Sequence, residues 1–408
     1  MKRMLLVILV MAFSTNVPTP IFPLYQAAYG LTTAMITMLY AIYAVGVLVM
    51  LLAGGSIAER LGARPVAFAG AILAIISAVA FLAAKSPVAL FAGRLIGGFA
   101  VGSFTGTSNA ILLQMTPPGR RDRILGLSAT LNLFGFGLGP ALGGTLVRYA
   151  PSHAMDVPFV VLMVALGMAI ALLLSLRAGP ELPALSGPTR GLLEQRQAEH
   201  GSPRTPTARS AFRLGVPPAG RALFWGVVGP AVFTGFAFAG MAFALLPGVA
   251  RATFGTAGRG LGGLLVFVMT TTGALVQLAQ KPSASPARLG WGLVMLGVGS
   301  WLMILGESLA APVAVLSGAL LEGAGNGWAF QASLRLAGVL AERGDRVQVM
   351  STYFLCGYAG LSIPVVATGE LSRALGVIPS MAVTGILLSG LLLLAISFMR
   401  RAPVSQAG

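Results

Sequence analysis

Long apolar runs separated by short polar or charged stretches repeat along nearly the whole chain. The hydrocarbon core of a membrane is about 30 Å thick, and an α-helix needs about 20 apolar residues to cross it. The apolar runs have this length, so the pattern predicts an all-α membrane protein with twelve transmembrane helices. Their expected ranges are 4–25, 33–56, 65–84, 87–113, 124–147, 157–176, 222–249, 260–280, 288–306, 309–334, 347–369 and 376–399.

The longest polar interruption, about 178–221, is rich in Pro, Arg, Gly and Ser. It divides the twelve predicted helices into six and six. We therefore expect an N-terminal six-helix bundle over 1–177, a cytoplasmic linker over 178–221 and a C-terminal six-helix bundle over 222–408.

Composition agrees with this pattern. Hydrophobic residues make up 56% of the chain and charged residues 9%, with a mean hydropathy of +0.87. Such a chain has too little polar surface for a soluble protein of 408 residues, so lipid is the expected solvent. The net charge of +16 does not indicate nucleic-acid binding, because that would need a basic face on a soluble domain.

The basic residues instead predict orientation. Most of the 27 Lys and Arg fall in short loops between apolar runs. With the N-terminus inside, about 20 of them lie on the cytoplasmic side, about five lie outside, and Arg94 and Arg335 fall within helices. We therefore expect both termini in the cytoplasm and the chain in the cell (inner) membrane. Met1 to Arg3 and the following apolar run resemble a signal peptide, but the run continues to Pro23, so we expect an uncleaved first helix.

Residues that commonly perform catalysis or hold metals are scarce. Cys356 is the single cysteine and lies in an apolar run, and the two histidines, His153 and His200, lie in predicted loops. No metal site, cofactor or nucleophile triad is supported. A membrane-embedded enzyme would need titratable groups clustered at one depth, so we expect the chain not to be an enzyme.

The loop after the second predicted helix reads Gly55-Ser-Ile-Ala-Glu59-Arg60-Leu-Gly62-Ala-Arg64. It is similar to the signature of the major facilitator superfamily, Gly-x-x-x-Asp-Arg/Lys-x-Gly-Arg-Arg/Lys, with Glu59 in place of Asp and Ala63 in place of one basic residue. The resemblance implies transport by two six-helix halves. It also implies a conformational latch made by this loop, with Glu59 and Arg60 in a breakable charge contact. A loop whose charges only set topology is the alternative.

The fourth helix carries Leu90-x-x-x-Arg94-x-x-Gly97-Gly98, which is similar to a second superfamily motif with an intramembrane arginine. Helical spacing places Thr105 almost above Arg94, with Ser108 and Asn109 beside it. A charge facing lipid costs about 2.5–3.5 kcal/mol even on the lenient scale, so we expect this polar stripe to face a water-filled cavity. The resemblance suggests a part for Arg94 in proton coupling. A structural arginine that reaches the outer interface is the alternative.

The fifth helix has the most specific pattern: Gly126, eight residues, Gly135, three residues, Gly139-Pro140, two residues, Gly143-Gly144. It has the spacing of the antiporter motif of major facilitator exporters. The glycines at 135, 139 and 143 lie on one face, so another helix can pack against bare backbone, and Pro140 frees part of the hydrogen-bond ladder. The resemblance implies a seal against leak and favours export. A purely structural glycine stripe is the alternative.

Among eleven acidic residues, only Glu322 falls near the middle of a predicted helix. A carboxyl group at that depth loses the hydration of its charged form, so the neutral form is favoured and the group can exchange a proton. Glu322 is therefore the expected proton-coupling residue. Asn326 and Ser333 share its face and predict a polar line bordering a central cavity. A protonated, purely structural glutamic acid is the alternative. Drug-exporting relatives often carry acidic residues in the first or fifth helix, and this chain has none there.

The expected substrate cavity combines few polar groups with aromatic walls, which suits a small amphiphilic solute. Its candidate residues are Asn16, Thr19, Thr105, Asn109, Phe236, Asn326, Trp328, Tyr353 and Tyr358. We expect a proton-coupled secondary active transporter, similar to the twelve-helix drug:proton antiporter-like family, that exports a small amphiphilic solute or drug by alternating access. It would interact with substrate, protons and lipid, and the superfamily resemblance implies a monomer. The alternatives are a proton symporter that imports a metabolite and a non-transporting membrane sensor or assembly factor.

Overall fold

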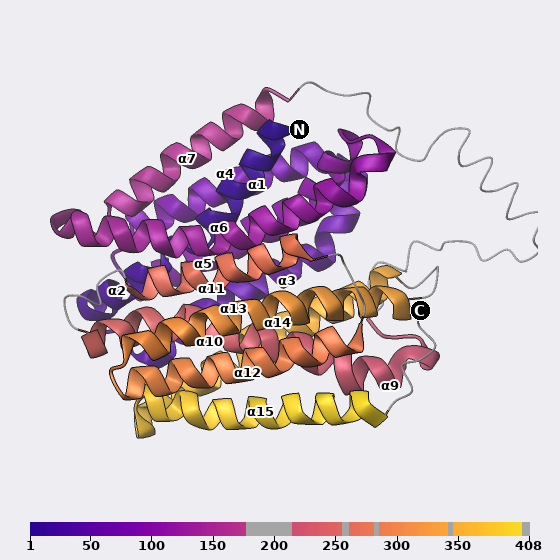
Figure 1. Ribbon diagram of the computed structural model, residues 1–408. Helices are drawn as coiled ribbons and strands as arrows, with labels where there is room; N and C mark the ends of the chain where they lie inside the picture. The colour runs from indigo at the N-terminus through magenta and orange to yellow at the C-terminus, as the bar shows by residue number, and fades with distance from the viewer. Residues whose placement is uncertain (177–213, 255–260, 281–284, 342–345, 402–408) are drawn as a thin grey trace, which may run out of the picture.

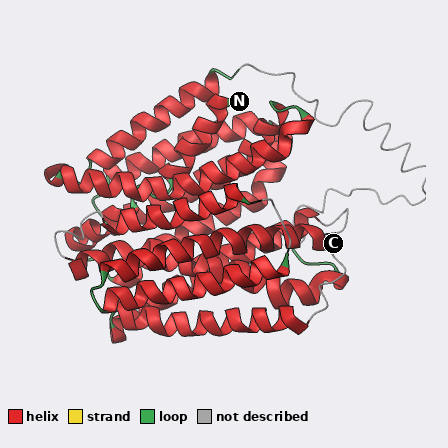
Figure 2. Cartoon of the chain, viewed as in Figure 1, coloured by secondary structure: helices red, strands yellow, loops and turns green. Residues whose placement is uncertain are grey.

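A computed structural model describes residues 1–176, 214–254, 261–280, 285–341 and 346–401. Within these residues the chain is helical and has no strand (Figure 2). The predicted linker residues 178–213, with His200, lie outside the described part. The helices of the first half are α1 (Lys2–Ser14), α2 (Phe22–Tyr29), α3 (Thr33–Leu61), α4 (Ala63–Leu82), α5 (Pro87–Gln114), α6 (Arg121–Tyr149) and α7 (Val157–Leu174).

The helices of the second half are α9 (Arg221–Leu223), α10 (Gly229–Phe254), α11 (Leu261–Ala279), α12 (Pro286–Ser308), α13 (Pro312–Leu340), α14 (Arg346–Leu375) and α15 (Val377–Arg401). A π-helical segment, Phe224–Val228, joins α9 to α10. With α1 and α2 counted as one crossing and α9 to α10 as another, the described helices make twelve crossings, as predicted.

Eleven of these segments are long and apolar enough to cross a membrane, and α13 is not among them. Glu322 and Asn326 lower the hydropathy of α13. The helix packs against α11, α12 and α14, so much of its surface contacts protein. An interior helix can carry polar side chains that a lipid-facing helix cannot.

The first predicted crossing, 4–25, is confirmed as a candidate membrane span over Lys2–Tyr29, but it is not one continuous helix. Helix α1 ends at Ser14, a single 3₁₀ turn covers Thr19–Ile21, and α2 begins at Phe22. Pro18, Pro20 and Pro23 have no N–H to donate to a helical ladder, and their rings clash with the preceding turn. Three prolines within six residues therefore break the helix inside the membrane, where the freed backbone groups need other partners.

The two halves lie one above the other in Figure 1. They are joined along two helix pairs, α3 with α14 and α6 with α11, and α10 also touches the first half at the 3₁₀ turn Thr19–Ile21, at α2 and at α3. An even number of crossings places the start of α1 and the end of α15 at the same end of the bundle (Figure 1). We call this the inner end, after the orientation predicted from the basic loops, and the opposite end, where α2 meets α3, the outer end.

Candidate functional site

Arg94 occupies the break in the first crossing. Its Nη1 donates a hydrogen bond of 2.6 Å to the carbonyl oxygen of Thr15, the residue that caps the C-terminus of α1. The last carbonyls of a helix have no partner within the helix, and cations are favoured beside them. Arg94 on α5 therefore stabilises the helix end that the prolines create.

The surroundings of Arg94 are mainly aromatic, and the cavity beside it has a volume of only about 20 Å³. Its side chain is only 2% exposed, which also excludes an arginine reaching the outer interface. The guanidinium carbon lies 4.6 Å from the ring centre of Tyr43, 4.9 Å from that of Tyr40 and 5.6 Å from that of Phe22. Such cation–π contacts compensate part of the lost hydration. Nε and Nη2 have no hydrogen-bond partner.

The residues of the polar stripe predicted above Arg94 lie in different environments. Thr105 is half-buried and accepts a hydrogen bond from Ser108 Oγ through its carbonyl oxygen. Asn109 is exposed, and its Oδ1 accepts a hydrogen bond of 2.9 Å from Ser128 on α6. The three positions share a face of α5 with Arg94, but the neighbouring helices differ along that face.

A chain of hydroxyl groups runs from the broken helix to the second half. Thr19 Oγ1 lies 2.6 Å from the Tyr40 hydroxyl, and that hydroxyl donates to the carbonyl oxygen of Phe243 on α10 at 2.9 Å. Tyr40 has a single hydroxyl proton, so Thr19 donates to Tyr40 when Tyr40 donates to Phe243. Both hydroxyl residues are buried. Thr19, predicted as a substrate contact, thus takes part in a contact between the halves.

The glycine stripe on α6 packs directly on the first crossing. An added Cβ at Gly135 would meet Leu9 and Ala12, one at Gly139 would meet the carbonyl oxygen of Phe13, and one at Gly143 would meet the carbonyl oxygen of Val17. Contacts this close are possible only for glycine. An added Cβ at Gly126 would meet nothing within 4 Å, so the first glycine of the motif is outside this contact. Gly144 is buried.

Pro140 and Asn16 are linked through one carbonyl group. Because Pro140 has no N–H, the carbonyl of Phe136 lacks its helical partner. Asn16 Nδ2 lies 3.5 Å from that oxygen and donates a long hydrogen bond to it. Asn16, predicted to line the substrate cavity, therefore has a structural contact that depends on Pro140.

Glu322 is buried in the middle of α13, with 1% of its side chain exposed. Ser300 Oγ on α12 lies 3.0 Å from Oε2, and Oε1 has no hydrogen-bond partner. No described cation lies within ion-pair distance of it. Glu322 thus lies against α12. Asn326, on the same face of α13, lies against α10, where a Cβ added to Gly235 would be 3.4 Å from Asn326 Oδ1. Ser333, also on this face, lies against α14, with its Oγ 2.9 Å from the Tyr353 hydroxyl.

Aromatic residues of the second half form one connected group. The ring centres of Phe236 and Tyr358 are 5.8 Å apart, those of Phe236 and Phe330 are 6.1 Å apart, and those of Phe330 and Tyr353 are 6.2 Å apart. The structure therefore brings together three predicted cavity residues from α10 and α14. Trp328 on α13 has a buried indole Nε1 without a hydrogen-bond partner.

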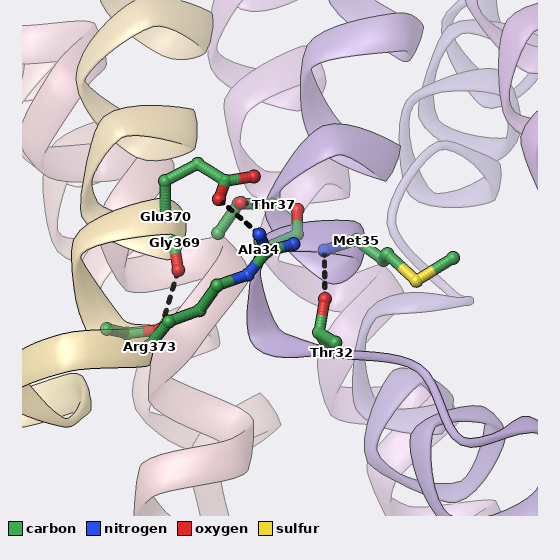
Figure 3. Close-up of polar contacts among 8 residues, drawn as sticks. Thr32, Ala34, Met35, Thr37, Gly369, Glu370 and Arg373 are labelled. Atoms are coloured by element: carbon green, nitrogen blue, oxygen red, sulfur yellow. Dashed lines mark hydrogen bonds and ion pairs between the residues drawn. The ribbon is translucent and has the colours of Figure 1, made fainter.

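At the outer end, α14 approaches the first turns of α3 (Figure 3). Thr37 is fully buried, and a Cβ on Gly369 would collide with its side chain. Glu370 and Arg373, paired at 2.9 Å, lie beside this contact (Figure 3). A cavity of about 420 Å³ also lies at this end between the halves, and its lining contains no charged side chain. The lining residues are Phe22, Pro23, Gln26, Thr33, Ile36, Ala244, Leu245, Gly248, Val249, Val377, Ile378 and Pro379.

The family of this chain follows from a sequence comparison. A family model described as Major Facilitator Superfamily matches residues 4–364, most of the chain. The chain belongs to the major facilitator superfamily. This confirms the family predicted from the glycine motifs, and the superfamily consists of transporters.

Relatives within the superfamily include drug-resistance proteins. The chain is 27% identical over 140 residues to the quinolone resistance protein NorA of Staphylococcus aureus, covering 34% of this chain and 36% of NorA. It is 27% identical over 168 residues to the multidrug resistance protein MdtL of Escherichia coli O157:H7, covering 41% of this chain and 43% of MdtL. Each of these two alignments thus covers less than half the length of the relative.

Solved structures share the fold over the whole chain. A D-xylose-proton symporter superposes with a TM-score of 0.74 at 16% identity, covering 100% of this chain and 98% of that one. A POT family transporter in complex with 5-aminolevulinic acid gives 0.72 at 14% identity, covering 98% and 96%. At these identities the likeness shows the major facilitator fold.

The superfamily signature loop lies at the inner end. Gly55, Glu59 and Arg60 are in the last turns of α3, and the side chain of Glu59 lies outside the described part. Arg60 is exposed and Arg64 is partly buried. Gly62 separates α3 from α4 with φ of +89°, a conformation that side chains other than glycine rarely adopt. The glycine at this position of the signature is therefore required by the turn.

Sequence reasoning missed Tyr40, Tyr43 and Ser300. The two tyrosines are spaced i, i+3 on α3 and so share one face. Two tyrosines on one face of a membrane helix, together with an intramembrane arginine that has no acidic partner, are a signal for a cation–π site. Ser300 lies in an apolar helix among glycines, and nothing in its local sequence connects it with Glu322.

Proposed function

We propose that this protein is a proton-coupled secondary transporter that exports a small amphiphilic solute or drug by alternating access. The observation that carries the proposal is the Glu322 site, a buried carboxyl group with a serine beside it and no described cation. The names of the relatives, quinolone and multidrug resistance proteins, support the direction and the substrate class.

The geometry around Ser300 supports a protonated Glu322 in this conformation. Ser300 Oγ lies 2.9 Å from the Leu296 carbonyl oxygen and 3.0 Å from Glu322 Oε2. The serine hydroxyl has one proton, and the backbone carbonyl can only accept. Both hydrogen bonds form together when the Glu322 carboxyl carries a proton and donates to Ser300. A buried carboxyl group without a cation is also far less costly when neutral.

Transport then requires Glu322 to exchange this proton when the halves rearrange. The proposed moving units are residues 1–177 and 222–408, connected by 178–221. Their contacts along α3 with α14 and α6 with α11 are the surfaces that must slide or separate. The signature residues Gly55, Glu59, Arg60, Gly62 and Arg64 would form the latch at the inner end, and Arg94 would assist coupling by holding the broken first crossing.

The antiporter motif on α6 supports export through its packing. Its glycines hold α1 at backbone contact, and α11 contacts the other side of the same helix, where a Cβ on Gly263 would collide with the carbonyl of Pro140. Helix α6 is thus closely packed on two faces. Such packing leaves little space for leak of protons or solute along this interface.

The aromatic group of Phe236, Tyr353 and Tyr358 and the uncharged outer cavity support a lipophilic substrate. The relevant energy source is the proton gradient, which supplies about 2.3 kcal/mol per 100 mV and about 1.4 kcal/mol per pH unit. The proposed orientation has both termini in the cytoplasm, because the basic loops favour it. The proposed monomer in the inner membrane follows from the superfamily resemblance.

Proteoliposomes test this proposal. Purified protein is incorporated into vesicles that contain a pH-sensitive dye, a proton gradient is imposed, and lipophilic cations, neutral drugs and zwitterionic metabolites are added in turn. Export by antiport predicts that a substrate moves opposite to protons and dissipates the gradient. Movement of substrate and protons in the same direction would make the protein a symporter, and absence of flux with every compound would contradict transport of this class.

A further inference from the structure

The hydrogen bonds of Arg94 do not account for its guanidinium group. The group has five N–H donors in a rigid plane and is always charged in proteins. Thr15 accepts from Nη1, while Nε and Nη2 have no partner although the side chain is 2% exposed. A buried donor left without an acceptor costs about 1–3 kcal/mol, and more when it is charged. An additional acceptor at this position would remove that cost.

The positive charge of Arg94 also lacks a full counter-charge. The ionisable groups nearest to it are Tyr40 and Tyr43, both neutral phenols at physiological pH, and no described carboxylate forms an ion pair with it. The C-terminus of α1 offers the equivalent of about half a negative elementary charge at Thr15. The rings of Tyr40, Tyr43 and Phe22 contribute only cation–π attraction. A monovalent anion would complete the balance.

A small cavity borders Arg94 and is suited to such an anion. Its volume is about 20 Å³, and Arg94, Tyr43 and Thr15 are among its lining residues. About 10–15 Å³ on this measure holds one water molecule, so the cavity has room for a single water or a monatomic anion. It is too small for a carboxylate attached to a larger molecule.

The two serine hydroxyl groups around the cavity already donate their protons elsewhere, so Arg94 and Tyr43 are the donors proposed for an anion. Ser14 Oγ donates to the Met11 carbonyl oxygen at 2.7 Å, and Ser77 Oγ donates to the Gly93 carbonyl oxygen at 2.7 Å. Their protons are therefore used. The Tyr43 hydroxyl is within hydrogen-bonding reach of Thr15 and borders the same cavity, so it can turn its proton towards an occupant.

We propose that this cavity is a chloride site, in which Arg94 and Tyr43, which both line it, hold one ion against the break between α1 and α2. The bound chloride stabilises the broken first crossing and thereby links the stability of the fold to the anion. This site is independent of the proposed direction of transport and of the substrate, because binding is measured on the purified protein without flux.

Thermal unfolding in detergent tests the site. The midpoint Tm is measured while chloride replaces gluconate at constant ionic strength, because gluconate is too large for the cavity. A saturable rise in Tm with chloride, repeated with bromide, is expected from a ligand that binds the folded state. An identical Tm in all three salts across the titration would overturn the proposal and leave water as the occupant.

Two variants locate the binding. An added Cβ at Gly97, which borders the cavity, would lie only 2.9 Å from Ser77 Oγ, so Gly97→Ala displaces the Ser77 side chain and takes up part of the cavity that both residues line. Gly97→Ala should abolish the chloride response, whereas Gly126→Ala, where an added Cβ meets nothing, should keep it. Tyr43→Phe should raise the apparent Kd for chloride about tenfold through loss of one hydrogen bond to a charged group.

Tyr25→Phe is the control for the tyrosine variant. Its hydroxyl donates to the Phe81 carbonyl oxygen in the same half, and Tyr25 is not among the lining residues of the cavity. This variant should leave the chloride Kd unchanged. A chloride response that survives in both Gly97→Ala and Tyr43→Phe with unaltered Kd would place the anion elsewhere and overturn the proposal.

Discussion

The hydroxyl group of Tyr40 on α3 donates a hydrogen bond of 2.9 Å to the carbonyl oxygen of Phe243 on α10, and so joins the two halves of the chain. The same tyrosine ring lies 4.9 Å from the guanidinium carbon of Arg94. One side chain thus connects the buried cation, the broken first crossing and the second half. In the proposed alternating access the halves move relative to each other, so we expect this bond to break in the opposite conformation.

Removal of this hydroxyl should shift the conformational equilibrium. We expect Tyr40→Phe to destabilise the present conformation by about 1 kcal/mol, the net value of one hydrogen bond, or about fivefold in the equilibrium constant. The native cysteine is removed by Cys356→Ala, and spin labels are attached at the exposed positions through Thr32→Cys and Leu375→Cys. The labels report the distance between the start of α3 and the end of α14 at the outer end. The population with longer distances should grow.

Tyr29→Phe provides the control for that experiment. The Tyr29 hydroxyl donates to the Ala84 carbonyl oxygen within the first half, so its loss changes no contact between the halves. Its distance distribution should match that of the parent protein. Equal distributions for Tyr40→Phe and the parent would show that the Tyr40 bond does not hold the halves together.

Glu322→Gln tests proton coupling. The amide has nearly the shape of a protonated carboxyl group but cannot release a proton, so the variant should lose substrate-driven proton flux while it retains exchange of labelled substrate across the vesicle membrane. Glu370→Gln is the matched control, because Glu370 is only partly buried and is paired with Arg373 at the outer end of α14. Full proton coupling in Glu322→Gln would remove Glu322 from the mechanism.

Gly139→Ala should destabilise the packing of α6 on α1. Its new methyl group would collide with the carbonyl oxygen of Phe13, and backbone atoms cannot move aside cheaply. Overpacking of this kind costs about 1–3 kcal/mol. Gly126→Ala has open space on the same helix and should be neutral or stabilising by up to about 1 kcal/mol, because alanine favours the helix. Thermal unfolding of the two variants in detergent measures the difference, and equal Tm values would contradict backbone contact at Gly139.

A double-mutant cycle tests the link between Asn16 and Pro140. In the parent, Asn16→Ala leaves the Phe136 carbonyl without a donor and should cost about 1 kcal/mol of unfolding free energy. In Pro140→Ala the restored N–H can bond that carbonyl, so Asn16→Ala should cost less there. Additive effects of the two substitutions would show that Asn16 does not serve the carbonyl that Pro140 frees.

Local sequence rules predicted much of the α6 contact. Glycines at 135, 139 and 143 had to share a face because helical periodicity fixes that relationship, and the same rule placed Asn326 and Ser333 beside Glu322. The rule does not state which neighbouring helix meets each level of the face. Glu322 contacts Ser300 of α12, whereas Ser333 contacts Tyr353 of α14, so a line of polar residues on one helix is not one continuous site.

The sequence by itself determined the membrane class and the number of crossings, because a backbone in lipid must satisfy its own hydrogen bonds and apolar runs of about 20 residues do so as helices. The spacing of its glycine motifs indicated the family. Only the tertiary structure decided what Arg94 meets. Its acceptor on Thr15 and the rings of Tyr40 and Tyr43 come from segments distant in the chain. Their meeting depends on how α1, α3 and α5 pack around the proline break, which no local pattern specifies.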